Sequence, residues 1–143
     1  MTLPVLLLLF LFPGQAKESP FAMGEQSALG EYAFDSEDFQ GSANLLSEAV
    51  RLGSISPDVY YMLGSSHYKL GQLGMAEASL LRALAINPTI GKAYLQLYNV
   101  FMRGQIPEKA LKAVDTYLEK YPDAKDREYV QSMADKLRKT LKP

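Results

Sequence analysis

A repeat of 34 residues runs through the middle of this 143-residue chain, and it constrains the fold more than any other feature. Four sets of equivalent positions keep this spacing: Leu29, Leu63 and Leu97; Ser42, Ala76 and Ala110; Leu46, Leu80 and Val114; and Val50, Leu84 and Leu118. A period of about 20–50 residues is typical of stacked repeat proteins, in which each unit buries its apolar face against its neighbours. We therefore predict three units without insertions, at residues 23–56, 57–90 and 91–124.

The first half of the second unit has the signals of one short helix. Ser56 can cap free N–H groups, and Pro57 fits the first helical turn. Apolar residues follow at helical spacing over residues 60–67. Gly71 tolerates the left-handed conformation that often ends a helix. These signals predict a helix that begins near Pro57 and ends before Gly71.

The second half of the same unit predicts a second helix. Its apolar stripe covers residues 73–84, and Asn87 followed by Pro88 ends it. Gly64 on the first helix and Ala76 on the second are small, although both lie on buried stripes. Small residues let two helix backbones approach closely, so a bulky replacement should cost about 1–3 kcal/mol by overpacking.

This unit resembles the tetratricopeptide repeat, whose pattern places aromatic, Leu-Gly, Ala and Pro residues at fixed offsets. The matching residues are Tyr60, Leu63, Gly64, Tyr68, Gly71, Ala76, Leu80, Ala83 and Pro88. In the third unit Tyr98 replaces the first glycine and Gly104 comes one residue early, while the first unit has no turn glycine at residues 35–37. The resemblance covers residues 23–124. It implies an all-α fold, a right-handed superhelical stack (α-solenoid) of three helix-turn-helix repeats.

The last segment, residues 125–143, continues with helical periodicity. Its apolar positions are Tyr129, Val130, Met133, Leu137 and Leu141. Asp123, with Asp126 three residues later, suggests a capped helix start. A helix with one apolar and one charged face is what the end of a stacked array requires. We therefore predict a C-terminal capping helix, and seven helices in all.

Residues 1–16 differ from the rest of the chain, because they carry no charged side chain and contain an unbroken apolar run at 5–12. This run is shorter than the roughly 20 residues that span a bilayer. Gly14 and Ala16 provide the small residues that a signal peptidase reads. We predict a secretory signal peptide cleaved after Ala16, a tail at residues 17–22, and a periplasmic or secreted protein. No Lys or Arg precedes the apolar run, so the alternative is an uncleaved N-terminal anchor or a mis-assigned start.

The resemblance implies that the first helices of the units line a concave face, where a segment of another protein would lie. The residues expected on this face are Glu31, Phe34, Asp35, Tyr61, Ser65, Tyr68, Lys69, Leu95, Asn99, Met102 and Arg103. Aromatic and Met side chains supply contact area, and Lys69 and Arg103 can bind carboxylates or carbonyls. The competing interpretation is that Tyr68, Phe34 and Met102 only pack between adjacent units.

Some members of the family bind an acidic chaperone tail through a cluster of Lys, Asn and Arg. In this sequence Lys92 matches one member of that cluster. The remaining places hold Ser27, Glu31, Ser65 and Gln96. An acidic tail is therefore not expected as the ligand.

The composition gives little support to catalysis. The chain has no Cys and a single His, which removes disulfides, thiolate metal sites and thiol nucleophiles. His67 lies on the apolar stripe of its helix, so packing is the favoured role. The acidic turn at residues 35–38 lacks the pattern of a calcium loop and is expected to cap the next helix. We predict no enzyme activity, no metal, no cofactor and no small-molecule substrate.

Charge is distributed unevenly along the chain, although the net charge is only −1. Residues 17–58 hold eight acids and two bases, and residues 59–143 hold thirteen bases and eight acids. Acids are interleaved with the bases of the last helix, which argues against nucleic acid as a partner. The asymmetry permits a second function, a homo-oligomer joined end to end by its acidic and basic ends. The alternative is that solvated faces differ by chance.

Overall fold

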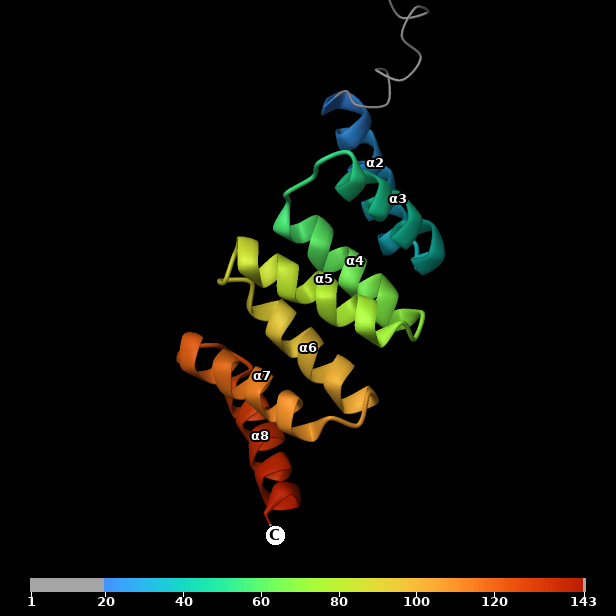
Figure 1. The fold of residues 1–143 in the computed structure, drawn as a ribbon. Coiled ribbons are helices and arrows are strands. Elements are labelled where there is room, and N and C mark those ends of the chain that lie inside the picture. The colour runs from blue at the N-terminus through green and yellow to red at the C-terminus, as the bar shows by residue number, and fades with distance from the viewer. Residues whose placement is uncertain (1–19, 143) are drawn as a thin grey trace, which may run out of the picture.

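The computed structural model describes residues 20–142, so the predicted signal peptide lies outside the described residues. In this range the chain forms seven α-helices: α2 (Pro20–Asp35), α3 (Phe39–Arg51), α4 (Pro57–Lys69), α5 (Leu73–Ile86), α6 (Gly91–Arg103), α7 (Pro107–Lys120) and α8 (Arg127–Leu141). The predicted all-α stack is confirmed (Figure 1). The first helix begins at Pro20, inside the segment predicted to be a tail.

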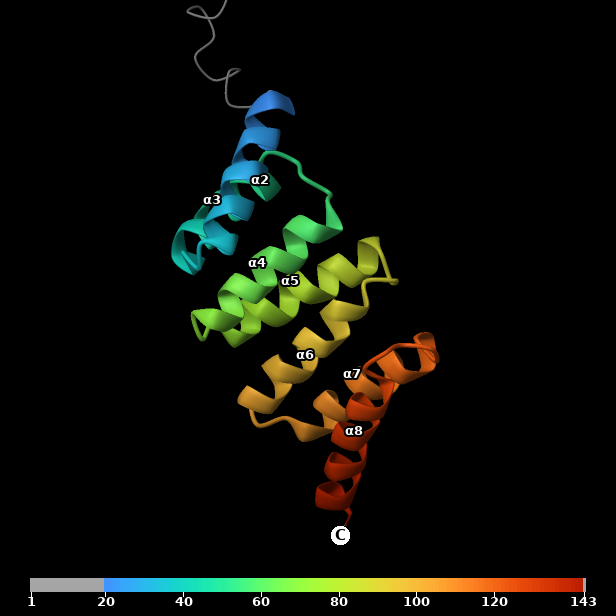
Figure 2. The ribbon, with the colours of Figure 1, turned by 180° about the vertical axis from the view of Figure 1, so that it is seen from behind.

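The helices pack as successive pairs, α2 with α3, α4 with α5 and α6 with α7, and α8 packs on α7. Figures 1 and 2 show the pairs stacked along one axis, from α2 at one end to α8 at the other. The first helices of successive pairs also contact one another, whereas in residues 20–142 the second helices do not pack closely together. We call the side of α2, α4 and α6 the inner face, and the side of α3, α5 and α7 the outer face.

Small residues set the spacing within the first two pairs, as predicted for Gly64 and Ala76. A Cβ on Gly64 would lie 2.7 Å from Leu80 Cγ and 3.1 Å from the carbonyl oxygen of Ala76. A Cβ on Gly30 would lie 2.6 Å from Leu46 Cδ2. In both pairs the second helix therefore fills the space that a side chain on the first helix would need.

The turn inside each pair has the same backbone shape, whatever residue occupies it. Glu37, Gly71 and Gln105 lie 34 residues apart and have φ angles of 60°, 76° and 59°. Gly71 takes the left-handed conformation predicted for it. The third unit is not shifted by its early glycine, because Gln105 adopts the strained conformation and Gly104 keeps a φ of −79°.

Replacing Glu37 or Gln105 with Gly is expected to stabilise the protein by about 0.5–1 kcal/mol at each site. A left-handed conformation costs a residue with a Cβ about 1–2 kcal/mol, and the extra chain entropy of Gly offsets part of this gain. Thermal unfolding of the single and double variants measures the effect. Ser36→Gly, in the same turn but without a positive φ, is the matched control and should destabilise. A lower melting temperature for both variants would contradict this explanation of the turn.

Helix capping differs in part from the prediction. Asp38 caps α3 as expected, because its Oδ1 accepts a hydrogen bond from the Gly41 N–H at 2.9 Å. Ser56 and Asp126 hold the N-cap positions of α4 and α8 but make no capping bond. Asp126 Oδ1 instead accepts the hydroxyl proton of Tyr117 at 2.6 Å. This hydrogen bond and burial raise the pKa of Tyr117 to about 12.

The two ends of the described stack differ. At the C-terminal end α8 buries Val130, Ala134 and Leu137, as the capping prediction required. At the N-terminal end Phe21 is 81%, Leu29 46% and Tyr32 72% exposed. Leu29 is exposed although its repeat equivalents Leu63 and Leu97 are buried, because no described helix precedes α2 to cover it.

Candidate partner-binding surfaces

A hollow of about 440 Å³ lies on the inner face between α2 and α4. Its lining residues are Met23, Ser27, Glu31, Ser54, Ser56, Asp58, Val59, Met62 and Lys92. Two carboxylates and one ammonium group stand beside Met side chains, which can adapt to different apolar groups. Glu31 is the predicted binding residue that this hollow contains.

Lys92 is held at the edge of this hollow by two contacts. Its Nζ lies 3.3 Å from Asp58 Oδ1 and 4.3 Å from the centre of the Tyr61 ring. The ion pair joins α6 to α4, and the ring is half-buried under the ammonium group. Tyr61, one of the residues predicted to bind a partner, therefore lies beside this hollow with part of its surface already covered by Lys92.

A second hollow, of about 210 Å³, lies between α6 and α8. It is lined by Leu95, Tyr98, Asn99, Asp126, Tyr129, Val130 and Met133. Leu95 and Asn99 were predicted from the sequence. Tyr129 is 70% exposed although it was predicted on the apolar stripe that the last helix buries, so its place in this hollow was missed. No signal in the sequence indicated this exposure, because helical periodicity put Tyr129 beside Val130 on that stripe.

The middle of the predicted face is occupied by contacts within the protein. Arg103 Nη1 donates a hydrogen bond to the Tyr68 carbonyl at 2.7 Å, and the guanidinium group lies 5.4 Å from the Tyr68 ring centre. Arg103 thus ties α6 to α4. Ser65 is only 5% exposed, and its hydroxyl has no hydrogen-bond partner among the described residues. Met102 is exposed and free for contact.

The remaining predicted residues gather near the turn between α2 and α3. The rings of Phe34 and Phe39 meet edge to face at 5.9 Å, and Lys69 Nζ lies 5.5 Å from the centre of the Phe39 ring. The Phe34 contact joins α2 to α3 within the first helix pair, and the Lys69 contact joins the first pair to the second. Asp35 is exposed beside them. Phe34 is half-buried, but its ring contact lies within its own unit and not between adjacent units as the packing interpretation held.

His67 is buried, at 4% exposure, and its Nδ1 lies 2.6 Å from Gln72 Oε1. This partner satisfies one ring nitrogen within the protein, as a packing role requires. No group of His, Asp and Glu among residues 20–142 is arranged to hold a metal ion.

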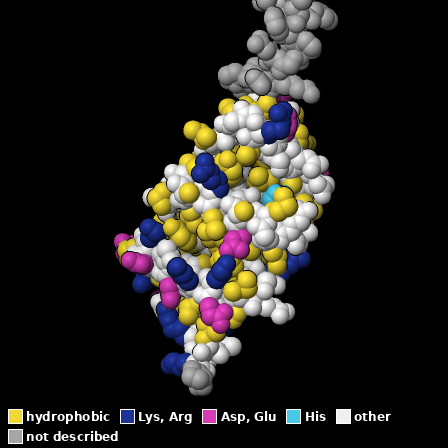
Figure 3. Space-filling model, viewed as in Figure 1, with side chains coloured by type: hydrophobic (Ala, Val, Ile, Leu, Met, Phe, Trp, Pro, Cys, Tyr) yellow, Lys and Arg dark blue, Asp and Glu magenta, His cyan; other side chains and the backbone are white. Residues whose placement is uncertain are grey.

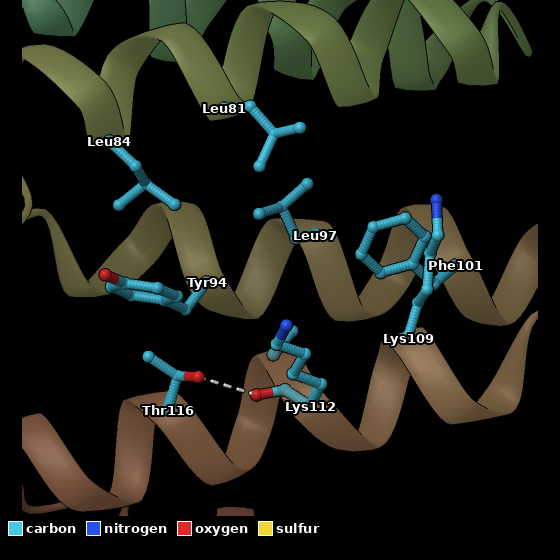
Figure 4. A pocket seen from close by; sticks show the side chains of 9 residues that line it. Leu81, Leu84, Tyr94, Leu97, Phe101, Lys109, Lys112 and Thr116 are labelled. Carbon is cyan, nitrogen blue, oxygen red and sulfur yellow. Dashed lines mark hydrogen bonds between the residues drawn. The ribbon is translucent and has the colours of Figure 1, made fainter.

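The outer face carries a further hollow, here called the outer pocket, between α5, α6 and α7 (Figure 4). It has a volume of about 250 Å³. Its apolar lining comprises Leu81, Leu84, Tyr94, Leu97, Phe101 and Ala113. Lys109, Lys112 and Thr116 complete it on the side of α7. The outer pocket was not predicted, although Leu81, an apolar residue beside the buried stripe of α5, was a signal for it.

Two contacts fix one edge of the outer pocket. Lys109 Nζ lies 2.9 Å from Glu77 Oε1 of α5, and 5.2 Å from the centre of the Phe101 ring. The side-chain bridge connects two helices whose backbones do not pack closely, so the space between them stays open over α6. Burial raises the pKa of Tyr94 at the opposite edge.

Comparison with known proteins agrees with this architecture. The family model for the tetratricopeptide repeat matches residues 27–89. The Arabidopsis OM64 TPR domain has a TM-score of 0.73 and 20% identity, over 84% of this chain and 97% of that one. The first TPR of Spaghetti (RPAP3) bound to the HSP90 peptide SRMEEVD has a TM-score of 0.72 and 18% identity, over 83% of this chain and 92% of that one. A third similar structure is the Yersinia enterocolitica type III secretion chaperone SycD in complex with a peptide of the translocator YopD. It has a TM-score of 0.77 and 12% identity, over 87% of this chain and 98% of that one.

The fold and the family match together define the class. Residues 27–89 match the tetratricopeptide-repeat family, and the described chain has the fold of tetratricopeptide-repeat domains, with three helix pairs followed by a single C-terminal helix.

Proposed function

We propose that this protein is a non-catalytic interaction scaffold that binds a segment of a partner protein along its inner face. The observation that carries the proposal is the pair of hollows at the two ends of that face, one between α2 and α4 and one between α6 and α8. Exposed or half-exposed Tyr129, Leu95 and Met62 offer contact area there. Structural neighbours that were solved with bound peptides support this use of the fold.

We place this scaffold outside the cytosol, in the envelope or secretory space. The proposal rests on the uncharged apolar segment at residues 1–16. No helix among residues 20–142 has the length and apolar character that crossing a membrane requires. N-terminal sequencing of the protein isolated from an exporting host is the test. A start at Lys17 would support export with cleavage, and a start at Met1 would contradict cleavage.

Peptides selected from a displayed library against the full chain would test the inner face. Binding should weaken at least about tenfold on Tyr129→Ser and on Asn99→Asp, because both side chains line the hollow at the C-terminal end. Tyr32→Ser removes an equally exposed aromatic residue outside both hollows and is the matched control. If the control loses affinity and the inner-face variants keep it, the binding surface lies elsewhere.

The peptide SRMEEVD, which is bound in one neighbour, is expected not to bind this protein more tightly than about 1 mM. Glu31 repels its carboxylates, and Lys92 is engaged by Asp58 and Tyr61. Fluorescence anisotropy of the labelled peptide measures this, with the Spaghetti repeat domain as the positive control. A micromolar dissociation constant would show that the charge pattern has been misjudged.

Self-association of copies through their acidic and basic ends is the second candidate function. The observation in its favour is the exposed apolar surface of α2 at the acidic end, formed by Phe21, Leu29 and Tyr32. Large exposed apolar groups with a charged rim often mark protein contacts.

A further inference from the structure

The exposed side of α2 combines apolar and acidic groups. Phe21, Ala28 and Tyr32 follow one another at offsets of seven and four residues, so they lie on one side of the helix with Leu29 beside them. All four are exposed. The charged residues of α2 are Glu25, Glu31 and Asp35, without a single base. This surface calls for a partner that is apolar at its centre and cationic at its rim.

The outer pocket has that chemistry. Its floor is made of leucines and the rings of Tyr94 and Phe101, and Leu81 reaches its rim with 48% of its side chain exposed. Lys109 and Lys112 lie along the α7 side (Figure 4). Figure 3 shows hydrophobic side chains at the surface on this side of the molecule, with Lys and Arg beside them in the lower half.

The size of the outer pocket selects the kind of occupant. Its volume of about 250 Å³ is below the roughly 300–1,000 Å³ of pockets that enclose small molecules. It is suited instead to one large side chain, inserted as an anchor by a protein surface that also covers the rim. A Phe fits the apolar floor better than a Tyr, since a buried hydroxyl would need a hydrogen-bond partner there.

The repeat itself supplies an internal comparison. Thirty-four residues earlier, Arg82 stands at the position equivalent to Thr116, and its guanidinium carbon lies 6.0 Å from the centre of the Tyr60 ring. Met75 and Ala78 stand where the third unit has Lys109 and Lys112. The third unit therefore has a small residue where the second has a covering cation, and lysines where the second has apolar residues.

We propose that α2 of one copy docks on the outer pocket of a second copy, with the Phe21 ring inserted and Glu25 facing Lys112. Glu25 lies one helical turn after Phe21 on the same side of α2, and Lys112 is exposed. This inference rests on the second candidate function, self-association, and is independent of peptide binding by the inner face.

The contact joins two different surfaces, so each bound copy still offers one free α2 or one free outer pocket. Such head-to-tail contacts generate open chains unless the rotation closes a ring. The inner face stays free in each copy. A chain of copies would therefore present its peptide-binding faces in series and bind a multivalent partner with increased avidity.

The test is sedimentation velocity at increasing protein concentration. The full chain is expressed in an exporting host and purified in the form that this host produces. Oligomers are expected at an ionic strength of about 0.05 M and should shrink at about 0.5 M, because exposed charge pairs are screened. Phe21→Ser removes the anchor, and Thr116→Arg adds a long cationic side chain beside Tyr94, at the position where Arg82 lies over the Tyr60 ring in the second unit. Each variant alone should be monomeric, with at least a tenfold weaker association.

Mixing the two variants is the decisive measurement. Phe21→Ser retains an intact outer pocket and Thr116→Arg retains an intact α2, so together they should form a 1:1 dimer and nothing larger. Glu25→Lys or Lys112→Glu alone should weaken assembly, and combining the two charge reversals in one chain should restore it. Both positions are exposed, and unchanged melting temperatures will show that the fold is intact.

Two results would overturn the proposal, and they differ in whether self-association by another surface is still possible. A monomer at every concentration and salt would remove self-association altogether. Oligomers that survive Thr116→Arg would keep self-association but exclude the outer pocket. Tyr129→Ser, on the inner face, should leave assembly unchanged while weakening peptide binding, so a failure of either function is seen separately.

Discussion

Leu80→Ala is expected to lower the free energy of unfolding by about 2–5 kcal/mol, the range for deleting a fully buried leucine. Leu80 has no exposed surface and packs in the largest core cluster of the described chain. It also fills the place that a side chain at position 64 would need, since a Cβ there would lie 2.7 Å from Leu80 Cγ. The substitution therefore opens a cavity where the two helices of the second pair approach most closely. Urea denaturation measures the loss.

Leu81→Ala is the matched control, because it is the next residue, has the same chemistry and is 48% exposed. It should cost less than about 1 kcal/mol. Equal losses for the two variants would show that burial in this pair has been misassigned.

Gly64→Ala probes the same contact from the other helix and should cost about 1–3 kcal/mol by overpacking. In the double variant the new methyl group enters the space that Leu80 vacated. The double loss should therefore be smaller than the sum of the single losses by about 1 kcal/mol or more. The carbonyl of Ala76, 3.1 Å from the added Cβ, keeps the rescue incomplete. Simple additivity would mean that the two residues do not meet.

The repeat and the helix pairing could be predicted from the sequence because they depend on local signals that recur. A glycine at position 64 and a leucine at position 80 are needed by the same contact, and the 34-residue spacing places that contact in the first two units, where Gly30 meets Leu46. The turn conformation was harder to predict. Gly104 comes one residue early in the repeat, yet the left-handed conformation lies at Gln105 and Gly104 keeps a negative φ.

The inner face was predicted less completely, because helical periodicity tells which side of a helix is buried but not what covers the other side. Ser65 was expected at the surface and is buried, whereas Arg103 is at the surface but bound to Tyr68. Tyr129 was missed because it belongs to a helix outside the repeat. Contacts between helices that are distant in the sequence decide all three cases.

The outer pocket depends on the distance between α5 and α7, which no local pattern encodes. Comparing equivalent positions of the repeat would have indicated part of it, since Thr116 is much smaller than its equivalent Arg82. A smaller side chain at an equivalent position of the repeat leaves a pocket only if the flanking helices do not move together to cover it. The structure was needed to show that they do not.

Val130→Asp is expected to lower the free energy of unfolding by more than about 3 kcal/mol, because it places an unpaired charge in an apolar site. Val130 is 1% exposed and packs with Val114, Tyr117 and Leu118 of α7. Acid should reduce the loss, since protonation of the new carboxyl group removes its charge. Denaturation at neutral and acidic pH measures both effects.

The loss should be confined at first to the C-terminal end of the stack. Each pair contacts mainly its neighbours, so hydrogen exchange should show α8 and α7 losing protection while α4 and α5 keep most of theirs. Tyr129→Asp is the matched control, since its side chain is 70% exposed and should tolerate the charge within about 0.5 kcal/mol. Tyr129→Asp should still weaken peptide binding, because Tyr129 lines the inner-face hollow. A global loss of protection in Val130→Asp would mean that the stack unfolds as one unit, and that α8 stabilises the distant hollow between α2 and α4 as well as its own.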